Sequence, residues 1–263
     1  MHAPARRRQA PSPMTAAAPS SIWRSRLAPP AALALMLALA ALFGAMRGAG
    51  LLGEQPLRAL LPLSFVAMMA MPWLLLNQAG RRAIGLRRPA ARSHYVDAVL
   101  EGMMAALVCF ALGIMFFGAS ADHWYTSIAS SYRANMDTTR LSMTQLYLIF
   151  TLPALLFSPI GEEIFFRGML QKALEQRWSV RTSTYIECAA FGLVHLCHHG
   201  LVLEAAGWRV RPLSAALWVL LMFLTALLFA HLRKRSGSLF PPMAAHAAFN
   251  ATMNAVIFAF LWK

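Results

Sequence analysis

The feature that most constrains the fold is a series of long apolar runs. About 20 consecutive apolar residues are enough to cross the hydrocarbon core of a bilayer as a helix. Hydrophobic residues make up 59% of the 263 residues and charged residues only 13%, unlike a typical soluble domain. The 184–197 run is the shortest and carries Glu187 and His195. The sequence therefore predicts an all-α, polytopic transmembrane bundle of about seven spans, over 29–46, 57–77, 98–118, 141–160, 184–197, 213–232 and 239–262.

The chain divides into a tail and one membrane domain. Residues 1–28 are rich in Pro, Ala, Ser and Arg, which predicts a disordered basic cytoplasmic tail. Arginines followed by an apolar run also resemble a signal peptide, but the run is long, so we expect an uncleaved first span. Residues 29–263 then form the transmembrane domain.

The net charge of +14 follows a membrane topology rather than a nucleic-acid surface. With the N-terminus inside, most of the 24 Lys and Arg residues fall in four successive inside segments, as the positive-inside rule requires. An odd number of spans places the C-terminus outside. No nucleic-acid partner is expected, because binding would need these charges on one face. The few basic residues on the outside are Arg47, Arg58, Arg133, Arg140, Arg209, Arg211 and Lys263.

One segment is too long for a straight span. Residues 141–177 contain only Pro153 and Pro159 as helix breakers. A helix of that length would approach 55 Å, against about 30 Å of hydrocarbon. Pro159 removes a backbone donor and clashes with the preceding turn. The sequence therefore predicts a broken helix near Pro159, directly before Glu162 and Glu163.

Ionisable residues within spans are costly and usually face the bundle interior. Counted from the span ends, Arg167, His195, His246 and Asn250 all fall near mid-membrane. Glu163 and Arg167 are four residues apart with the acid first, which favours a structural ion pair. Glu162 has no opposite charge at helical spacing on its own helix and is predicted to be the freer carboxylate. His246 and Asn250 are also four apart and share a helix face.

This set of residues suits hydrolysis. A carboxylate in an apolar pocket can activate a water as a general base, and an amide can donate to a developing oxyanion. Glu162 would be the base, His195 and His246 would hold the water or share its proton, and Asn250 would be the oxyanion donor. Glu162, His195 and His246 could instead supply three zinc ligands. His198 and His199 are expected at the outer membrane boundary.

Three motifs on successive predicted helices carry a family resemblance: "EEIFFR" (162–167), "FGLVH" (191–195) and "HAAFN" (246–250). Together they resemble the CAAX prenyl protease and bacteriocin-processing (CPBP, or Abi) family, with a motif core over about 140–255. The resemblance implies an intramembrane endopeptidase, with Glu162, His195, His246 and Asn250 as catalytic residues and Glu163 and Arg167 in support. It leaves open whether the chemistry is glutamate-dependent or uses a metal such as zinc.

Two other classes of function remain open. Transporters also use broken helices and midplane charges, but no second copy of the Glu-Glu pair or of the prolyl break is present. A catalytically inactive scaffold or immunity factor is the other alternative, although every motif residue is in place. The expected substrate is a membrane-embedded or lipid-anchored peptide or protein. The expected location is the inner membrane of a bacterium, with the N-terminus cytoplasmic.

Overall fold

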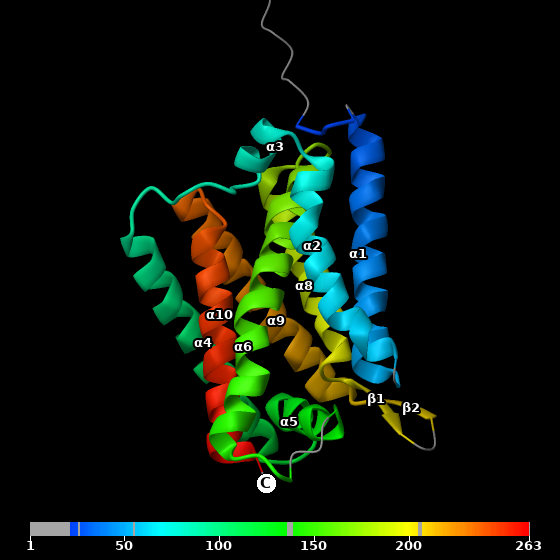
Figure 1. The fold of residues 1–263 in the computed structure, drawn as a ribbon, viewed down its shortest axis with the longest axis vertical. Coiled ribbons are helices and arrows are strands. Elements are labelled where there is room, and N and C mark those ends of the chain that lie inside the picture. Colours follow the sequence, from blue (N-terminus) through cyan, green and yellow to red (C-terminus); the bar gives the residue numbers. More distant parts are fainter. Residues whose placement is uncertain (1–21, 26, 55, 136–138, 205–206, 263) are drawn as a thin grey trace, which may run out of the picture.

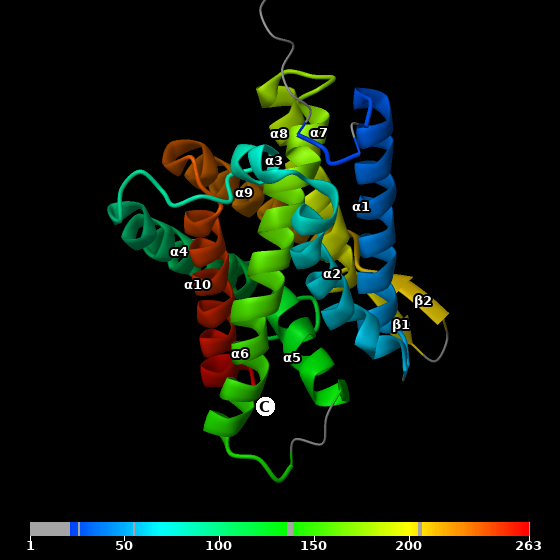
Figure 2. The same cartoon turned by 45° about the horizontal axis from the view of Figure 1, so that its top comes forward.

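The computed structural model describes residues 22–25, 27–54, 56–135, 139–204 and 207–262. Its long helices run roughly side by side between two ends of the bundle (Figure 1). The described chain starts at the end that also holds α3 and α7, and the C-terminus lies at the other end (Figure 2). The predicted all-α polytopic bundle is confirmed. Its long helices are α1 (Pro29–Leu52), α2 (Leu60–Leu75), α4 (Ser93–Phe117), α6 (Met143–Glu162), α8 (Val180–Val194), α9 (Pro212–Ser236) and α10 (Phe240–Val256).

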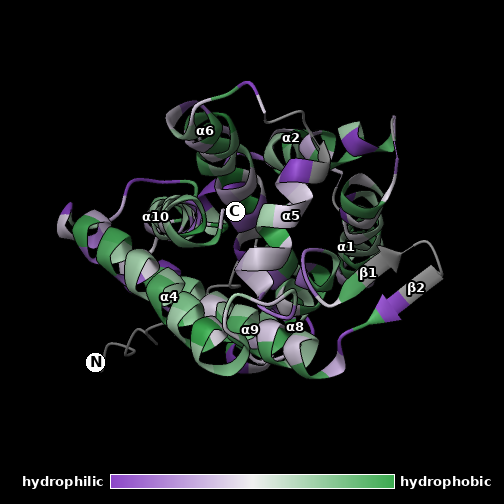
Figure 3. Ribbon diagram, turned by 90° about the horizontal axis from the view of Figure 1, so that it is seen from below, coloured by the Kyte–Doolittle hydropathy of each residue, from purple (hydrophilic) through white to green (hydrophobic). Residues whose placement is uncertain are grey.

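Shorter elements connect these helices. Helix α5 (Trp124–Asn135) lies at the C-terminal end of the bundle, among the ends of the long helices (Figure 3). The remaining short helices are η1 (Leu57–Ala59), α3 (Gln78–Ala83), α7 (Gln171–Leu174) and η3 (His195–Cys197). Strands β1 (Leu201–Glu204) and β2 (Gly207–Val210) pair as an antiparallel hairpin beyond η3.

Six helices are long and apolar enough to cross a membrane, judged by length and composition among the described residues. They match six of the predicted spans. Helix α8, which covers most of the seventh, has only 15 residues and does not reach that length. It nevertheless runs from the end that holds α7 toward the end that holds the hairpin (Figure 2), and η3 extends it. The predicted count of about seven therefore agrees with the path of the chain.

The predicted break at Pro159 is wrong. Pro159 lies inside α6, and helical structure continues without interruption from Met143 to Leu174. The irregularity begins after the proline, where Glu163–Leu170 form the π-helix η2. A π-helix has a wider turn and can absorb a strained stretch without ending the helix. The excess length is also accommodated by α7, which extends the same helix to the end of the bundle.

Part of the segment predicted to be a disordered tail is packed against the bundle. Residues 1–21 and 26 of the predicted tail lie outside the described residues. Within residues 22–25, however, the backbone N–H of Arg24 donates to Leu75 O at 2.9 Å, and Ile22 O accepts from Asn77 at 3.1 Å. The Trp23 side chain is buried. Residues 22–25 therefore bind the end of α2 and are not part of a disordered tail.

Two glycines allow close helix contacts beside the polar residues. A Cβ at Gly161 on α6 would lie 2.7 Å from Phe65 O on α2. A Cβ at Gly102 on α4 would lie 2.0 Å from Ala245 O on α10. Small residues at such crossings let helix backbones approach closely in membranes. These contacts fix the helix positions directly before Glu162 and His246.

Candidate active site

A cavity of about 380 Å³ lies inside the bundle. Most of its wall is aromatic or aliphatic. Helix α5 closes part of it with Ile128, Ser131 and Tyr132. The Tyr132 hydroxyl donates to Asn254 Oδ1 at 2.9 Å, which holds α5 against α10. The polar or ionisable side chains along the wall are Arg47, Ser131, Tyr132, Ser158, His195, His198, Trp218, Thr225, His246 and Asn250.

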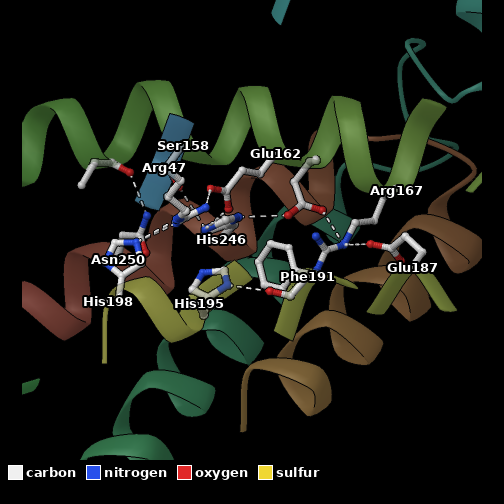
Figure 4. Close-up of polar contacts among 12 residues, drawn as sticks. Arg47, Ser158, Glu162, Arg167, Glu187, Phe191, His195, His198, His246 and Asn250 are labelled. Atoms are coloured by element: carbon white, nitrogen blue, oxygen red, sulfur yellow. Dashed lines mark hydrogen bonds and ion pairs between the residues drawn. The ribbon is translucent and has the colours of Figure 1, made fainter. Parts of the chain in front are cut away.

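The predicted Glu163–Arg167 ion pair is present. Arg167 Nε lies 3.2 Å from Glu163 Oε2, and both side chains are fully buried. The same nitrogen lies 3.5 Å from Glu187 Oε1 on α8. The guanidinium also stacks over the ring of Phe191 at 3.9 Å (Figure 4). Arg167 therefore joins η2 to α8 through two carboxylates, where the sequence had indicated one.

His246 lies between the two adjacent glutamates (Figure 4). Its Nδ1 is 2.9 Å from Glu163 Oε1 and its Nε2 is 3.9 Å from Glu162 Oε2. Nε2 is also 3.5 Å from the hydroxyl of Ser158. Successive side chains are rotated by a smaller angle in a π-helix than in an α-helix, because each turn holds more residues. The change to π-helix at Glu163 thus helps both carboxylates reach one imidazole.

The prediction that Glu162 is a freer carboxylate is wrong, because Arg47 on α1 pairs with it. Arg47 Nη1 donates to Glu162 Oε1, and both side chains are buried. Nε and Nη2 of Arg47 lie 3.0 and 2.8 Å from Nε2 of His198. Arg47 was predicted to be an outside charge, but α1 continues to Leu52 and keeps Arg47 within the bundle. His198, which was expected at the outer membrane boundary, lines the cavity beside Arg47.

His195 and Asn250 occupy other parts of the same wall. His195 Nδ1 is 2.7 Å from Phe191 O, so this nitrogen donates and Nε2 is left as the acceptor. Asn250 Nδ2 donates to Ala154 O at 2.9 Å, which leaves its second N–H available. The structure therefore gathers His195, His246 and Asn250 around one cavity, as their depths in the membrane predicted.

The buried charges nearly balance. Three carboxylates (Glu162, Glu163 and Glu187) are in contact with two guanidiniums (Arg47 and Arg167) through the ion pairs above. The carboxylates in these ion pairs therefore outnumber the guanidiniums by one. Uncompensated charge is costly in a low-dielectric interior. The imidazole of His246, which contacts Glu162 and Glu163, lies beside this excess of carboxylates.

The zinc site that the sequence allowed is not supported by this arrangement. Among the described residues, no three His, Cys, Asp or Glu side chains are grouped so that they could bind a metal ion. Glu162 is paired with Arg47, whose positive charge would repel a cation at that oxygen. Glu162, His195 and His246 thus do not form a ligand set in this arrangement.

Arg47, Glu187 and His198 were not among the site residues predicted from the sequence. Arg47 stands near the end of an apolar run, where an arginine usually reports topology. Glu187 offered a signal, because a carboxylate within a predicted span is rare and usually has a partner. His198 follows His195, the last residue of the second motif, by three residues, which places both on the same side of a helical turn.

The fold and the site together indicate the class of protein. It is a membrane-spanning helical bundle in which a buried polar cluster beside an apolar cavity forms a candidate catalytic site. Residues 144–252 match the family model of type II CAAX prenyl endopeptidase Rce1-like proteins. This match confirms the resemblance seen in the motifs and indicates a membrane peptidase. Searches of curated proteins and of solved structures found no match.

Proposed function

We propose that this protein is an intramembrane endopeptidase that hydrolyses a peptide bond of a membrane-associated peptide or protein. The observation that carries the proposal is the position of His246, 3.9 Å from Glu162 Oε2 and 2.9 Å from Glu163, on the wall of an apolar cavity. An apolar cavity with a few converging polar groups is typical of a ligand site. The family match and the six candidate spans support a substrate that reaches the site from the membrane.

Glu162 is the proposed general base. Its Oε2 has no hydrogen-bond partner among the described residues, so it can accept a proton from a water. The water oxygen then attacks the scissile carbonyl carbon. His246 shares the proton with Glu162 and passes it to the departing amine. Glu163 and Arg167 hold His246 in place through the Nδ1 contact.

Asn250 and His195 would act on the substrate. The free N–H of the Asn250 amide can donate to the oxygen of the scissile carbonyl as negative charge develops on it. His195, fixed by its bond to Phe191 O, presents Nε2 as an acceptor that can orient the water. These roles need no group beyond the side chains described and a water molecule.

The test is peptide cleavage by the purified protein in liposomes. A fluorogenic prenylated peptide with a CAAX ending is the first probe, because the matched family is described by that substrate. Glu162→Gln, His195→Ala and His246→Ala should abolish cleavage, and Asn250→Ala should reduce it by about 100- to 1,000-fold. Glu101→Gln is the matched control, since Glu101 is a partly exposed carboxylate paired with Arg235.

A second experiment identifies natural substrates. Membrane proteomes of cells with the wild-type protein and with Glu162→Gln are compared for uncleaved precursors. We also propose that the protein lies in the inner membrane of a bacterium, with its N-terminus in the cytoplasm. Near-normal cleavage by Glu162→Gln would remove the general-base role. No cleavage of any probe, with identical proteomes, would favour the inactive scaffold instead.

A further inference from the structure

Arg47 is the only side chain with a permanent charge among the described residues that line the cavity. It is 5% exposed, and it is held between Glu162, His198 and the ring of Phe65, whose centroid is 5.6 Å from the guanidinium carbon. The wall around it is otherwise neutral or apolar. A buried anion in such a cavity would find only this cation to compensate its charge.

Glu162 lies behind this arginine. Its side chain is fully buried and does not form part of the cavity wall, whereas Arg47 and His246, which both contact it, do. A molecule that enters the cavity therefore meets Arg47 and His246 before it meets Glu162. In this conformation the proposed base is bound by a cation and covered from the substrate.

The guanidinium can still bind another group. Of its five N–H bonds, one on Nη1 points to Glu162, and those on Nε and one on Nη2 point to His198. One N–H on each terminal nitrogen is left without a partner in the described part of the chain. An arginine with a free N–H on each terminal nitrogen can donate to the two oxygens of a carboxylate.

We propose that Arg47 binds a carboxylate of the substrate, the free carboxyl terminus of a peptide, and that this contact releases Glu162 to act as the base. The inference rests on the proposed peptidase function. The incoming carboxylate replaces Glu162 as the counter-ion of Arg47, so the guanidinium stays paired with one carboxylate. Arg47 is thus a specificity-determining residue: it favours peptides whose terminus lies within reach of the scissile bond.

The peptide experiment compares one fluorogenic substrate as the free acid and as the C-terminal amide. Wild type should prefer the acid by about 10- to 100-fold in kcat/KM, the range of a charge-assisted hydrogen bond. Arg47→Lys should keep part of the preference, and Arg47→Gln should cleave both forms at similar rates. Arg88→Gln, a change at an exposed arginine, should keep the full preference. Equal cleavage of both forms by wild type, or a preference that survives Arg47→Gln, would overturn the proposal.

A binding experiment separates this proposal from peptidase function. The probes are acetyl-Leu-Ala-Leu as acid and as amide, and decanoate with decanamide, each measured by the thermal unfolding midpoint. The tripeptide acid should stabilise wild type more than its amide does. It should stabilise Glu162→Gln still more, because the competing carboxylate is gone, and the double variant Arg47→Gln/Glu162→Gln not at all.

The outcomes of the binding experiment are distinct. Acid-selective stabilisation without any cleavage would reject the peptidase function and leave the carboxylate site of Arg47 standing. Stabilisation by decanoate but not by the tripeptide acid would assign the site to a fatty acid and overturn the peptide terminus as its ligand. Weaker binding of the acid by Glu162→Gln than by wild type would show that Glu162 and the ligand do not compete, and would overturn the release mechanism.

Discussion

Removal of Arg167 should be among the most destabilising single changes in this protein. Arg167→Met leaves two fully buried carboxylates, Glu163 and Glu187, without the guanidinium that lies 3.2 and 3.5 Å from them. Breaking a buried ion pair from one side costs about 3–5 kcal/mol. Loss of the contact with the Phe191 ring adds about 0.5–2 kcal/mol. We therefore expect a loss of about 3.5–7 kcal/mol in the free energy of unfolding.

The decisive comparison is the effect of Glu187→Gln on the free energy of unfolding, which should have opposite signs in wild type and in the Arg167→Met background. In wild type, Glu187→Gln removes a counter-ion of Arg167 and should destabilise the fold. In the Arg167→Met background the same change removes a stranded buried charge and should recover about 1–3 kcal/mol. Thermal unfolding in a mild detergent measures the stability of wild type, of both single variants and of the double variant. The control Arg88→Met, at an exposed site, should stay within about 0.5 kcal/mol of wild type. An effect of Glu187→Gln with the same sign in both backgrounds would refute the reasoning.

Two further predictions concern pH and topology. Burial, the larger cause for both, lowers the pKa of His123 and of His199 to about 4, and Arg211 lowers that of His199 further. The unfolded chain takes up these protons first, so stability should fall as the pH drops from about 6.5 toward 4. His199→Gln should weaken that dependence in melting curves, and an unchanged slope would remove His199 as a contributor. Reporter fusions at Ala90 and Lys263 should report inside and outside, respectively; the same side for both would refute an odd number of crossings.

The parts of the site that were predictable are local in the sequence. Glu163 and Arg167 are one helical turn apart, and His246 and Asn250 share a face, so helix geometry alone relates them. The convergence of His195, His246 and Asn250 followed from their similar depth in spans of known length. The bundle itself followed from apolar run length, because the bilayer sets how long a spanning helix must be.

The parts that were missed depend on distant contacts or on backbone detail. Arg47 and Glu162 are separated by 115 positions, and no spacing rule connects an arginine near the end of one span to a carboxylate on another. Pro159 read as a helix break, yet tertiary packing keeps α6 helical through it. The shift to π-helix at Glu163 leaves no mark in residue periodicity, although it sets where both glutamates point.

The Arg47–Glu162 pair also constrains how the protein is made. Chain synthesis proceeds at about 5–20 residues per second, so the 115 positions between them take about 6–23 seconds to emerge. Throughout that interval α1 holds Arg47 without Glu162, its partner in the folded protein. Arg47 stands five residues before the end of α1, close enough to the lipid head groups for its long side chain to reach water. The guanidinium of Arg47 can therefore stay hydrated at the bilayer surface after α1 has inserted. It moves into the bundle only when α6 inserts and brings Glu162 beside it.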